Sequence, residues 1–375
     1  MTLQASELPD IVLVFAPYIE SGGQLISPHY DLPEYRAEID GWMRGLSLDW
    51  EWRPVTVANL AAEIDHARKV ARDRSCVVFN LCDGTEADGY PGFEVVEALD
   101  RAGLSYTGAD AAFYRNTTSK ALSKALFVRR GVSTAPHYLI RADSSSIDAA
   151  IKAVGFPIFI KPDVSAGSYG IQVDSVCHDR ADVERKIKQL MEGMHGQHFE
   201  KNGILAEAFV QGREFTVLAV EDAAAPGGLR VVPAAERVFD PRVSVDERFL
   251  AFERYWELPE ENRRLPPGDP YYWYELAPAA WQDELADLSR RAIRAVDGAG
   301  YARVDIRQDE VRRVFFVLEV NAQCGLSADD SATVGSMLRQ SGHTIIEIIA
   351  LVLAHGIARR KSGNRKPIAA SMTGA

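Results

Sequence analysis

Two alternating stretches near the C-terminal end constrain the fold of this chain more than any other feature. Residues 302–307 and 314–321 alternate apolar and polar side chains on either side of a charged turn, a pattern typical of an antiparallel β-hairpin. A turn centred on Arg312 sets which residues face each other across the strands. The expected facing pairs are Asp305 with Glu319 and Arg303 with Asn321. Because alternate residues of a strand point the same way, we expect these four side chains on one face.

These four facing side chains have the chemistry of a metal site. Two carboxylates that face each other repel unless a cation lies between them. Asp305, Glu319 and the amide oxygen of Asn321 are hard ligands, suited to Mg²⁺ that keeps its other positions for water and phosphate. Arg303 cannot bind that metal, but it could stabilise a developing anion. The pattern alone fits an ordinary hairpin equally well, with the arginine paired to a carboxylate.

Length and composition restrict the class of protein. The 375 residues are enough for two or three domains, and 47% hydrophobic with 25% charged residues is ordinary for a soluble globular protein. A net charge of −11 argues against nucleic acid as a partner, although a local basic pocket for a small anion stays compatible with it. We expect no signal peptide and no membrane span, because the first residues lack a basic and apolar leader and no apolar run approaches ~20 residues.

Cysteine usage indicates a reducing compartment. No two of the four cysteines form a CxxC pair, and their spacing does not suggest a zinc site. We therefore expect a cytoplasmic protein. The four positions are Cys76, Cys82, Cys177 and Cys324.

Strands that alternate with helices predict a small α/β domain in the first third of the chain. Residues 10–16 and 76–81 are apolar runs that predict buried strands, while residues 58–72 and 93–103 have helical patterns. Residues 17–30 and 82–92 contain Gly and Pro and predict loops. The domain is expected to extend over residues 1–115.

The next segment predicts one helix over residues 117–131. Thr117 or Thr118 is a suitable N-cap, and Gly131 is a suitable stop. Lys120 and Lys124 are four residues apart and therefore share one face of this helix. A pair of lysines at this spacing also occurs on ordinary solvated faces.

A loop of small residues follows a strand that ends at Lys161. Residues 163–170 let backbone N–H groups approach an anion, and a strand is expected to resume at Ile171. The loop matches neither the phosphate-binding P-loop nor the dinucleotide fingerprint, and a plain hairpin is the alternative.

Two acidic residues lie within apolar strands further along the chain. Glu207 and Glu214 flank a turn at residues 211–213, and a buried carboxylate needs partners such as lysines or ligand hydroxyls. Exposed strand positions are the alternative for each. Residues 221–275 have no clear pattern and predict a long lid or binding loop. Residues 281–296 and 344–357 predict helices, and residues 361–375 predict a disordered tail.

Taken in order, these elements resemble the ATP-grasp superfamily and, within it, the D-alanine–D-alanine ligase type. The similarity covers roughly residues 76–355 and consists of NLCDG with DGYPG, LSYTG, SKALSKALF, FPIFIKP with VSAGSYG, LAEAFVQGREFTV, ARVDIR and LEVNAQCGLS. Each motif is weak alone, but the ordered set is specific. The resemblance implies an α/β fold, with an N-terminal parallel-sheet domain and two α+β lobes, residues 116–206 and 207–360, that enclose ATP.

The resemblance also implies roles for individual residues. Lys124 and Lys161 would contact the ATP phosphates, and Ser168 lies in the loop that would cover them. The implied adenosine contacts are Glu207 to the adenine amino group, the backbone of Ala208 and Val210 to the ring edge, Phe209 beside the base and Glu214 to the ribose. Asp305, Glu319 and Asn321 would hold two Mg²⁺ ions, with Mn²⁺ as an alternative. Arg303 and the backbone N–H of Gly325 would stabilise the tetrahedral oxyanion.

The chain departs from this family where substrates are recognised. Glu20 matches the acid of the family's first motif only in part, Cys82 replaces a histidine, and Gly167 replaces a serine of the phosphate loop. Arg254 is the nearest match to the family's substrate lysine. Asp330, followed by Ser331, stands where a serine would hold a carboxylate, and an aspartate there disfavours a carboxylate-bearing acceptor.

These features predict an ATP- and Mg²⁺-dependent carboxylate–amine ligase that forms an amide through an acyl phosphate on an amino-acid-like substrate. Its partners would be small carboxylates and amines, and the resemblance leaves a homodimer open. A D-alanine–D-alanine ligase of cell-wall synthesis and a non-catalytic nucleotide-binding protein are the alternatives.

Overall fold

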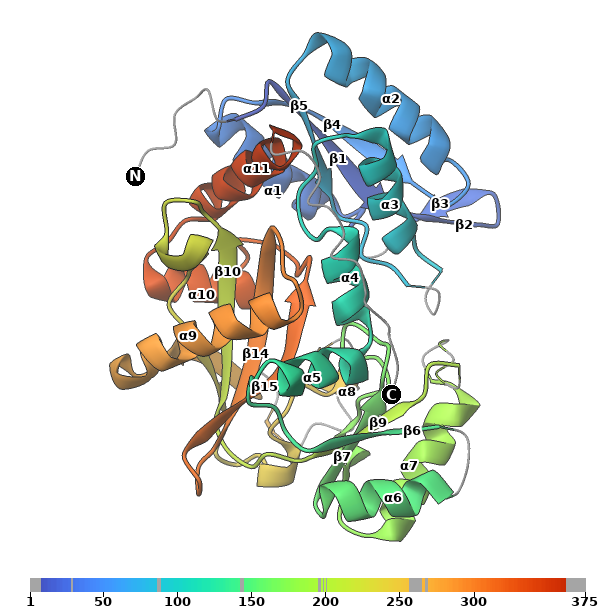
Figure 1. The fold of residues 1–375 in the computed structure, drawn as a ribbon, viewed down its shortest axis with the longest axis vertical. Helices are drawn as coiled ribbons and strands as arrows, with labels where there is room; N and C mark the ends of the chain where they lie inside the picture. The colour runs from blue at the N-terminus through green and yellow to red at the C-terminus, as the bar shows by residue number, and fades with distance from the viewer. Residues whose placement is uncertain are drawn as a thin grey trace.

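The computed structural model describes residues 8–27, 30–85, 89–141, 145–194, 197, 199, 201–255, 265–266 and 269–361. Three sheets organise the described chain, and a two-stranded hairpin is added to them. In Figure 1 the first sheet lies at the top, the largest sheet at the lower left and the third sheet at the lower right. The expected tail lies outside the described residues.

The first sheet is parallel, as the sequence predicted. Its order is β4-β1-β5, and every residue of the central strand is buried, which explains its continuous apolar sequence. Its strands are β1 (Ile11–Pro17), β4 (Asp49–Val55) and β5 (Cys76–Asn80). The helices of this part are α1 (Pro33–Gly45), α2 (Leu60–Asp73) and α3 (Phe93–Ala102). The loop expected after β1 contains the hairpin of β2 (Ile19–Ser21) and β3 (Gln24–Ile26).

The single helix predicted over residues 117–131 is wrong, because the chain breaks at Ser119 into α4 (Ala111–Thr118) and α5 (Lys120–Arg129). The N-cap of α5 is Ser119, whose side chain accepts a hydrogen bond from the Leu122 amide. The hydroxyls of Thr117 and Thr118 instead donate to carbonyls of α4, at 2.8 Å each.

The central sheet has the strand order β6-β9-β7-β8. Its strands are β6 (His137–Ile140), β7 (Ile158–Pro162), β8 (Val176–Cys177) and β9 (Ile204–Ala208), and its helices are α6 (Ser145–Val154) and α7 (Arg180–Glu192). The strand expected to resume at Ile171 is wrong: the Ile171 amide donates to the Ser168 carbonyl in a turn, and β8 begins five residues later.

The largest sheet has six strands in the order β13-β12-β10-β14-β15, with β11 paired to β10. Its strands are β10 (Glu214–Glu221), β11 (Leu229–Val231), β12 (Ala235–Phe239), β13 (Tyr272–Leu276), β14 (Tyr301–Asp309) and β15 (Val314–Ala322). The helices are α8 (Phe252–Tyr255), α9 (Ala279–Ala295), α10 (Thr333–Ser341) and α11 (Ile345–Lys361). Thus three of these strands lie in the stretch expected to be irregular.

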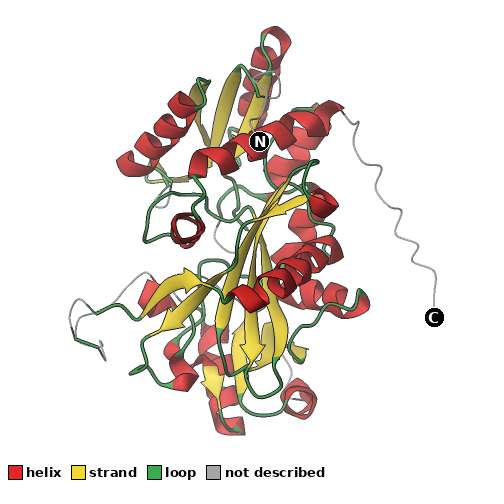
Figure 2. Cartoon of the chain, turned by 90° about the vertical axis from the view of Figure 1, so that its left-hand side faces the viewer, coloured by secondary structure: helices red, strands yellow, loops and turns green. Residues whose placement is uncertain are grey.

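The strands β9 and β10 are consecutive but belong to different sheets, so the chain crosses between lobes after Ala208. The boundary expected at residue 206 would cut β9. We therefore propose an N-terminal domain up to residue 115, a central lobe that ends at residue 208, and a C-terminal lobe beyond it. Figure 2 shows the parallel sheet of the N-terminal domain in the upper part of the molecule, with helices against it, and the longer strands of the other sheets below it.

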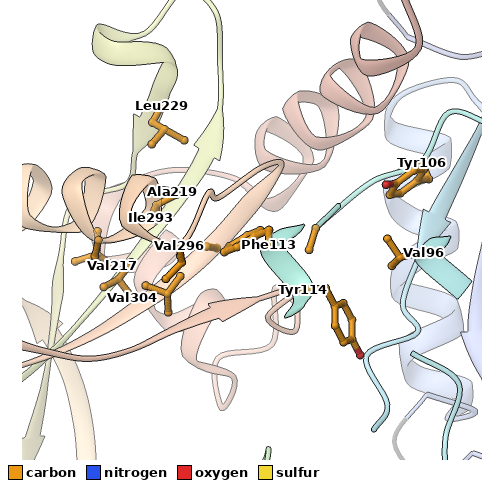
Figure 3. Close-up of a cluster of buried hydrophobic side chains, with 14 of the residues drawn as sticks. Val96, Tyr106, Phe113, Tyr114, Val217, Ala219, Leu229, Ile293, Val296 and Val304 are labelled. Carbon is orange, nitrogen blue, oxygen red and sulfur yellow. The ribbon is translucent and has the colours of Figure 1, made fainter. Parts of the chain in front are cut away.

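One apolar cluster joins the N-terminal domain to the C-terminal lobe. Phe113 of α4 lies in the same cluster as Val96 and Tyr106 on one side and Val217 and Val304 on the other (Figure 3). A second cluster buries α11 against both parts. No single described helix is long and apolar enough to cross a membrane; only α10 and α11 taken together, bent by 111°, meet that criterion. Ile348 and Leu353 of α11 are buried inside the protein.

Candidate active site

The hairpin of β14 and β15 has the predicted register up to Asp305, and a bulge between Asp305 and Ile306 shifts it by one residue in the half next to the turn. Asp305 lies opposite Glu319, and Arg303 lies opposite Asn321. Arg303 donates to Asp305 from Nε and from its terminal nitrogen, at 3.0 and 2.9 Å. Asn321 Nδ2 and Thr216 Oγ1 also donate to this carboxylate, at 2.9 Å each. Burial raises the pKa of Asp305, but Arg303 outweighs that effect and holds it below its usual value.

The four side chains line one large cavity. It has a volume of about 660 Å³ and is bounded by the N-terminal domain, the central lobe and the C-terminal lobe. Of the other residues predicted to act in the reaction, Lys161, Ser168, Glu214 and Gly325 also line it. The structure therefore brings the hairpin together with the small-residue loop and the lysine that precedes it, from two separate parts of the sequence.

A buried ion triad lies next to this cavity. Glu207 accepts bonds from Lys124 Nζ at 2.6 Å and from Lys161 Nζ at 2.7 Å, and all three residues are buried. Burial raises the pKa of Glu207, but the two ammonium groups lower it further, to about 2. Glu207 is therefore a carboxylate at neutral pH. Of the partners predicted for a buried carboxylate, lysines or ligand hydroxyls, the structure gives it two lysines, and the exposed alternative is wrong.

Lys120 occupies the position in the cavity that the sequence assigned to Lys124. Its Nζ donates to the Ser165 carbonyl at 2.7 Å and lies 3.7 Å from Glu319, and Lys120 lines the cavity. Lys124 has no exposed surface, and its Nζ is held by Glu207 and by Thr134 Oγ1. Lys120 and Lys161 thus line the cavity and Lys124 does not, so the contact of Lys124 with phosphate stays a prediction.

The break at Ser119 explains which lysine faces the cavity. Asp163, at the start of the small-residue loop, accepts bonds from Ser119 Oγ and from the Ala121 amide, at 2.6 and 2.7 Å. The first turn of α5 is thus fixed against this loop, which places Lys120 beside it. Lys124 lies one turn deeper and enters the core. The sequence identified the pair of lysines but carried no signal for this break except a serine, which is a good N-cap.

A second cation that sequence reasoning missed is Arg237 on β12. It faces Glu214 across the sheet, donates to it, and also donates to the Tyr274 hydroxyl from Nε at 3.0 Å. Arg307 Nε lies 3.4 Å from the other oxygen of Glu214. Glu214 is therefore a fixed, buried carboxylate at the wall of the cavity. Residues 235–239 do not alternate apolar and polar side chains, so the sequence pattern carried no signal for this strand or for the position of Arg237.

The side-chain oxygen atoms on this face of the hairpin are suitable ligands for Mg²⁺. Asp305 and Glu319 supply two carboxylates on one face, and the amide oxygen of Asn321 remains an acceptor because its nitrogen binds Asp305. Among the described residues, no three His, Cys, Asp or Glu side chains gather into a metal site. A set of two carboxylates and one amide oxygen suits an ion that takes one or two carboxylates from the protein and completes its coordination shell with water and phosphate. It does not suit an ion that is coordinated by protein ligands alone.

The residues predicted to flank adenine do not line the cavity themselves. Phe209 stacks on Phe159 with ring centroids 6.0 Å apart, and Phe159 together with Phe249 lines the cavity. The Ala208 amide donates to the Pro136 carbonyl at 2.8 Å, and Val210 is buried. Glu207 and these residues therefore lie one layer behind the wall that Phe159 and Lys161 form.

The residues predicted to bind substrate lie away from the cavity. Glu20 is exposed on the β2–β3 hairpin, and Cys82 is buried against the Phe15 carbonyl, where burial raises the pKa of its thiol. Arg254 binds Glu247 at 2.6 Å instead of facing the cavity. Asp330 pairs with Arg339, and Ser331 donates to Asp329. Burial or a local partner engages four of these side chains, and Glu20 is exposed. None of the five lines the cavity, so their contact with substrate stays a prediction. The wall at this end is formed instead by Ser27, Tyr30, Asp83, Thr85, Tyr90 and Tyr114.

Comparison with known proteins agrees with this geometry. The family model described as D-ala D-ala ligase C-terminus matches residues 126–354. The D-alanine–D-alanine ligase of Chromohalobacter salexigens is 29% identical over 288 residues, which is 76% of each chain. The uncharacterized protein y4sG of Sinorhizobium fredii is 28% identical over 300 residues, or 77% of each chain.

Solved structures share the fold. The D-alanine–D-alanine ligase of Bacillus anthracis complexed with ATP superposes with a TM-score of 0.61 at 16% identity, over 94% of this chain and 99% of that one. A biotin carboxylase of Campylobacter jejuni gives a TM-score of 0.62 at 13% identity, over 94% of this chain and 72% of its own.

The fold and the cavity between its lobes are those of an ATP-grasp protein, a class whose ligases use ATP and Mg²⁺. Within that class, the chain belongs to the D-alanine–D-alanine ligase family. It is an ATP-dependent ligase that forms an amide bond, which confirms the fold and the reaction class predicted from the sequence.

Proposed function

We propose that the ligase activates a small, amino-acid-like carboxylic acid as an acyl phosphate and then transfers the acyl group to an amine. The observation that carries this proposal is the hairpin face, where Arg303, Asp305, Glu319 and Asn321 line the same cavity as Lys120 and Lys161. Nucleotide binding alone requires phosphate and metal contacts. A fixed arginine next to the metal ligands additionally suits a reaction in which negative charge develops on oxygen.

In this proposal, Lys120 and Lys161 bind the phosphates, and the loop that contains Ser168 covers them. Glu207, as a carboxylate, accepts from the adenine amino group, and Glu214 accepts from the ribose hydroxyls. The backbone of Ala208 and Val210 and the ring of Phe209 complete the base site. Because Glu207 and these residues lie one layer behind Phe159, the proposal requires the Phe159 ring to move aside when the base binds. Lys124 has a different role: it supports Glu207 from inside the core.

Replacing each lysine by methionine separates these two roles. Lys120→Met is expected to weaken binding of Mg²⁺–ATP by about 10- to 100-fold, because a charge-assisted bond of ~1.5–3 kcal/mol is lost. Lys124→Met is expected to lower the unfolding free energy by roughly 3 kcal/mol, since it removes one partner of a buried pair, and to change affinity less. Calorimetric titration and urea unfolding measure the two quantities. Equal losses of nucleotide affinity in both variants would return the phosphate role to Lys124.

Asp305, Glu319 and Asn321 would hold Mg²⁺, with two ions and substitution by Mn²⁺ as parts of the proposal. The metal would supply Lewis-acid stabilisation of phosphate charge. Arg303 holds Asp305 in place and directs positive charge at the cavity, where with the Gly325 N–H it would stabilise the oxyanion formed when the amine attacks the acyl carbonyl. That attack forms the C–N bond and releases phosphate, and the amine loses a proton.

The substrates are expected to be a small carboxylic acid and an amine. The reaction of the relatives named above makes D-alanine the first candidate for both. Asp330 pairs with Arg339 and does not line the cavity, so the choice of acceptor in this proposal does not rest on Asp330. The departures from the family motifs at Glu20 and Cys82 support our preferred proposal, an acid other than D-alanine, and Asp83 and three tyrosines line the cavity wall where it would bind.

The experiment that tests the function is an assay of ADP formation with Mg²⁺–ATP and a panel of amino acids and amines, with the amide product identified by mass spectrometry. D-alanine alone is the first arm, and robust turnover there would establish the D-alanine–D-alanine ligase alternative. An amide formed only with another pair supports our preferred reading. If no pair produced ADP while the nucleotide still bound, the non-catalytic alternative would be favoured. Gel filtration tests the proposed homodimer, and a fluorescent fusion tests the proposed cytoplasmic location.

A further inference from the structure

The loop between β15 and α10 contains Gly325, and this glycine is the exposed centre of an otherwise buried segment. Its neighbours Cys324 and Leu326 are 6% and 1% exposed, and they pack in the cluster that also contains residues of α1 and β5. Gly325 itself lines the cavity. The position of its amide therefore depends on what holds the loop on either side.

The N-terminal part of this loop is held by the residues that directly follow β5. Gln323 has a backbone φ of +54°, and its Nε2 donates to the Cys82 carbonyl at 3.2 Å. Gly108, also in the N-terminal domain, leaves room for this side chain: a Cβ there would lie 2.8 Å from Gln323 Cγ. The loop thus leaves the hairpin with its first side chain anchored in the N-terminal domain.

The second side is held by helix α1, which has no other residue in the proposed chemistry. The Glu38 carboxylate accepts from the Ser327 hydroxyl at 2.8 Å and from the Ala328 amide. The Tyr35 hydroxyl, one turn earlier, donates to the Leu326 carbonyl at 3.4 Å, and burial raises the pKa of Tyr35, so it remains a donor. Two oxygens of one carboxylate therefore hold two consecutive residues, two and three positions beyond Gly325.

We propose that Glu38 is a positioning residue of the ligase: it fixes the Gly325 loop so that the backbone N–H of Gly325 meets the oxyanion during amine attack. This inference rests on the role proposed for Gly325 above. Its chemical consequence is specific to the second half of the reaction. Attack of a carboxylate on the γ-phosphate creates no tetrahedral carbon, whereas attack of the amine on the acyl phosphate does. A displaced loop therefore slows acyl transfer and leaves the acyl phosphate for water to hydrolyse.

The first test measures the loop directly and needs no substrate. Hydrogen exchange of the peptide that contains residues 323–332 is compared between the wild-type protein and Glu38→Gln, which keeps the size of the side chain but not its two acceptor oxygens. Exchange is expected to become about 10-fold faster, the loss of roughly one hydrogen bond. Glu34→Gln, an exposed position one turn earlier on α1, is the matched control and should leave the peptide unchanged. Unchanged exchange in Glu38→Gln would overturn the proposal.

The second test measures the number of ADP molecules formed per amide, with Mg²⁺–ATP and the substrate pair that the wild-type enzyme uses, D-alanine being the first tried. The ratio is expected to stay near one for the wild type and Glu34→Gln and to rise above about two for Glu38→Gln and Ser327→Ala, with the affinity for Mg²⁺–ATP unchanged. A merely structural role would lower both products together at a constant ratio, and that result would contradict the assignment. A wild-type protein that is inactive with every pair would refute the proposed function, while the exchange measurement would still decide whether Glu38 holds the loop.

Discussion

Glu319→Gln is expected to abolish Mg²⁺-dependent ADP formation, with a loss of more than ~10²-fold, since even groups that only orient a metal ligand cost about 10- to 100-fold. Glu319 is the more accessible of the two facing carboxylates, with a side chain 31% exposed against 12% for Asp305. It is also 3.7 Å from Lys120. Neutralising it removes a metal ligand and leaves the bonds of Asp305 to Arg303, Thr216 and Asn321 in place, so the fold should persist. The measurement is steady-state ADP release over a range of Mg²⁺ concentrations.

Glu310→Gln is the matched control for this variant, because Glu310 is an exposed carboxylate at the turn of the same hairpin. It makes the same change of charge and should retain full activity. A Glu319→Gln protein with wild-type turnover and an unchanged Mg²⁺ dependence would refute the metal assignment. Circular dichroism of both variants shows whether the comparison is between folded proteins.

The second large effect concerns stability. Glu207→Gln leaves the ammonium groups of Lys124 and Lys161 without their buried counter-charge, so we expect a loss of roughly 3–5 kcal/mol in the free energy of unfolding at pH 7. Urea unfolding followed by circular dichroism measures this loss. Glu192→Gln, an exposed position at the end of α7, is the matched control and should change stability by less than ~0.5 kcal/mol.

The lowered pKa of Glu207 also determines how the free energy of unfolding changes with pH. The pKa of Glu207 is about 2 in the folded protein against 4.5 when unperturbed, so the unfolded chain binds the proton more readily. Its stabilisation, on the order of 3 kcal/mol, is therefore complete above about pH 4.5 and is lost as the pH falls toward 2. In Glu207→Gln this part of the acid dependence should disappear. If the free energy of unfolding fell equally steeply with decreasing pH in the wild type and in Glu207→Gln, the lysines would not be what keeps Glu207 ionised.

The sequence was most informative where a short-range rule determines the structure. A turn centred on Arg312 placed Asp305 opposite Glu319, and alternation placed both on one face. Both hold, although a bulge next to Asp305 that the pattern did not indicate shifts the register nearer the turn. The buried strand β1 and the helices α2 and α9 also follow from apolar patterns alone. The resemblance to a known family then placed Lys161, Glu214 and Gly325 at one cavity, although they are far apart in the chain.

The sequence was least informative where contacts between distant segments decide. Lys120 and Lys124 are equivalent by helical spacing, and only the anchoring of Ser119 to Asp163 tells them apart. Arg254 and Asp330 looked suited to substrate, but each is engaged by a partner that pattern reasoning could not supply, Glu247 and Arg339. Arg237 was missed because its strand lies in a region rich in Gly and Pro. Pairings of this kind depend on tertiary packing, which no local propensity encodes.

The shared cores have a mechanical consequence. Two large apolar clusters continue from the N-terminal domain into the C-terminal lobe, whereas the main apolar core of the central lobe contains only residues between 138 and 206. One small cluster around Phe159, Phe209 and Phe249 joins the central lobe to the C-terminal lobe. Rotation of the N-terminal domain relative to the C-terminal lobe would disrupt the apolar clusters that they share. The central lobe can instead rotate as a rigid body about the short connections near residues 130–136 and 209–213. A hinge motion of the central lobe is thus the domain motion that disrupts the fewest apolar contacts. The Gly325 loop belongs to the part that stays fixed, the N-terminal domain together with the C-terminal lobe.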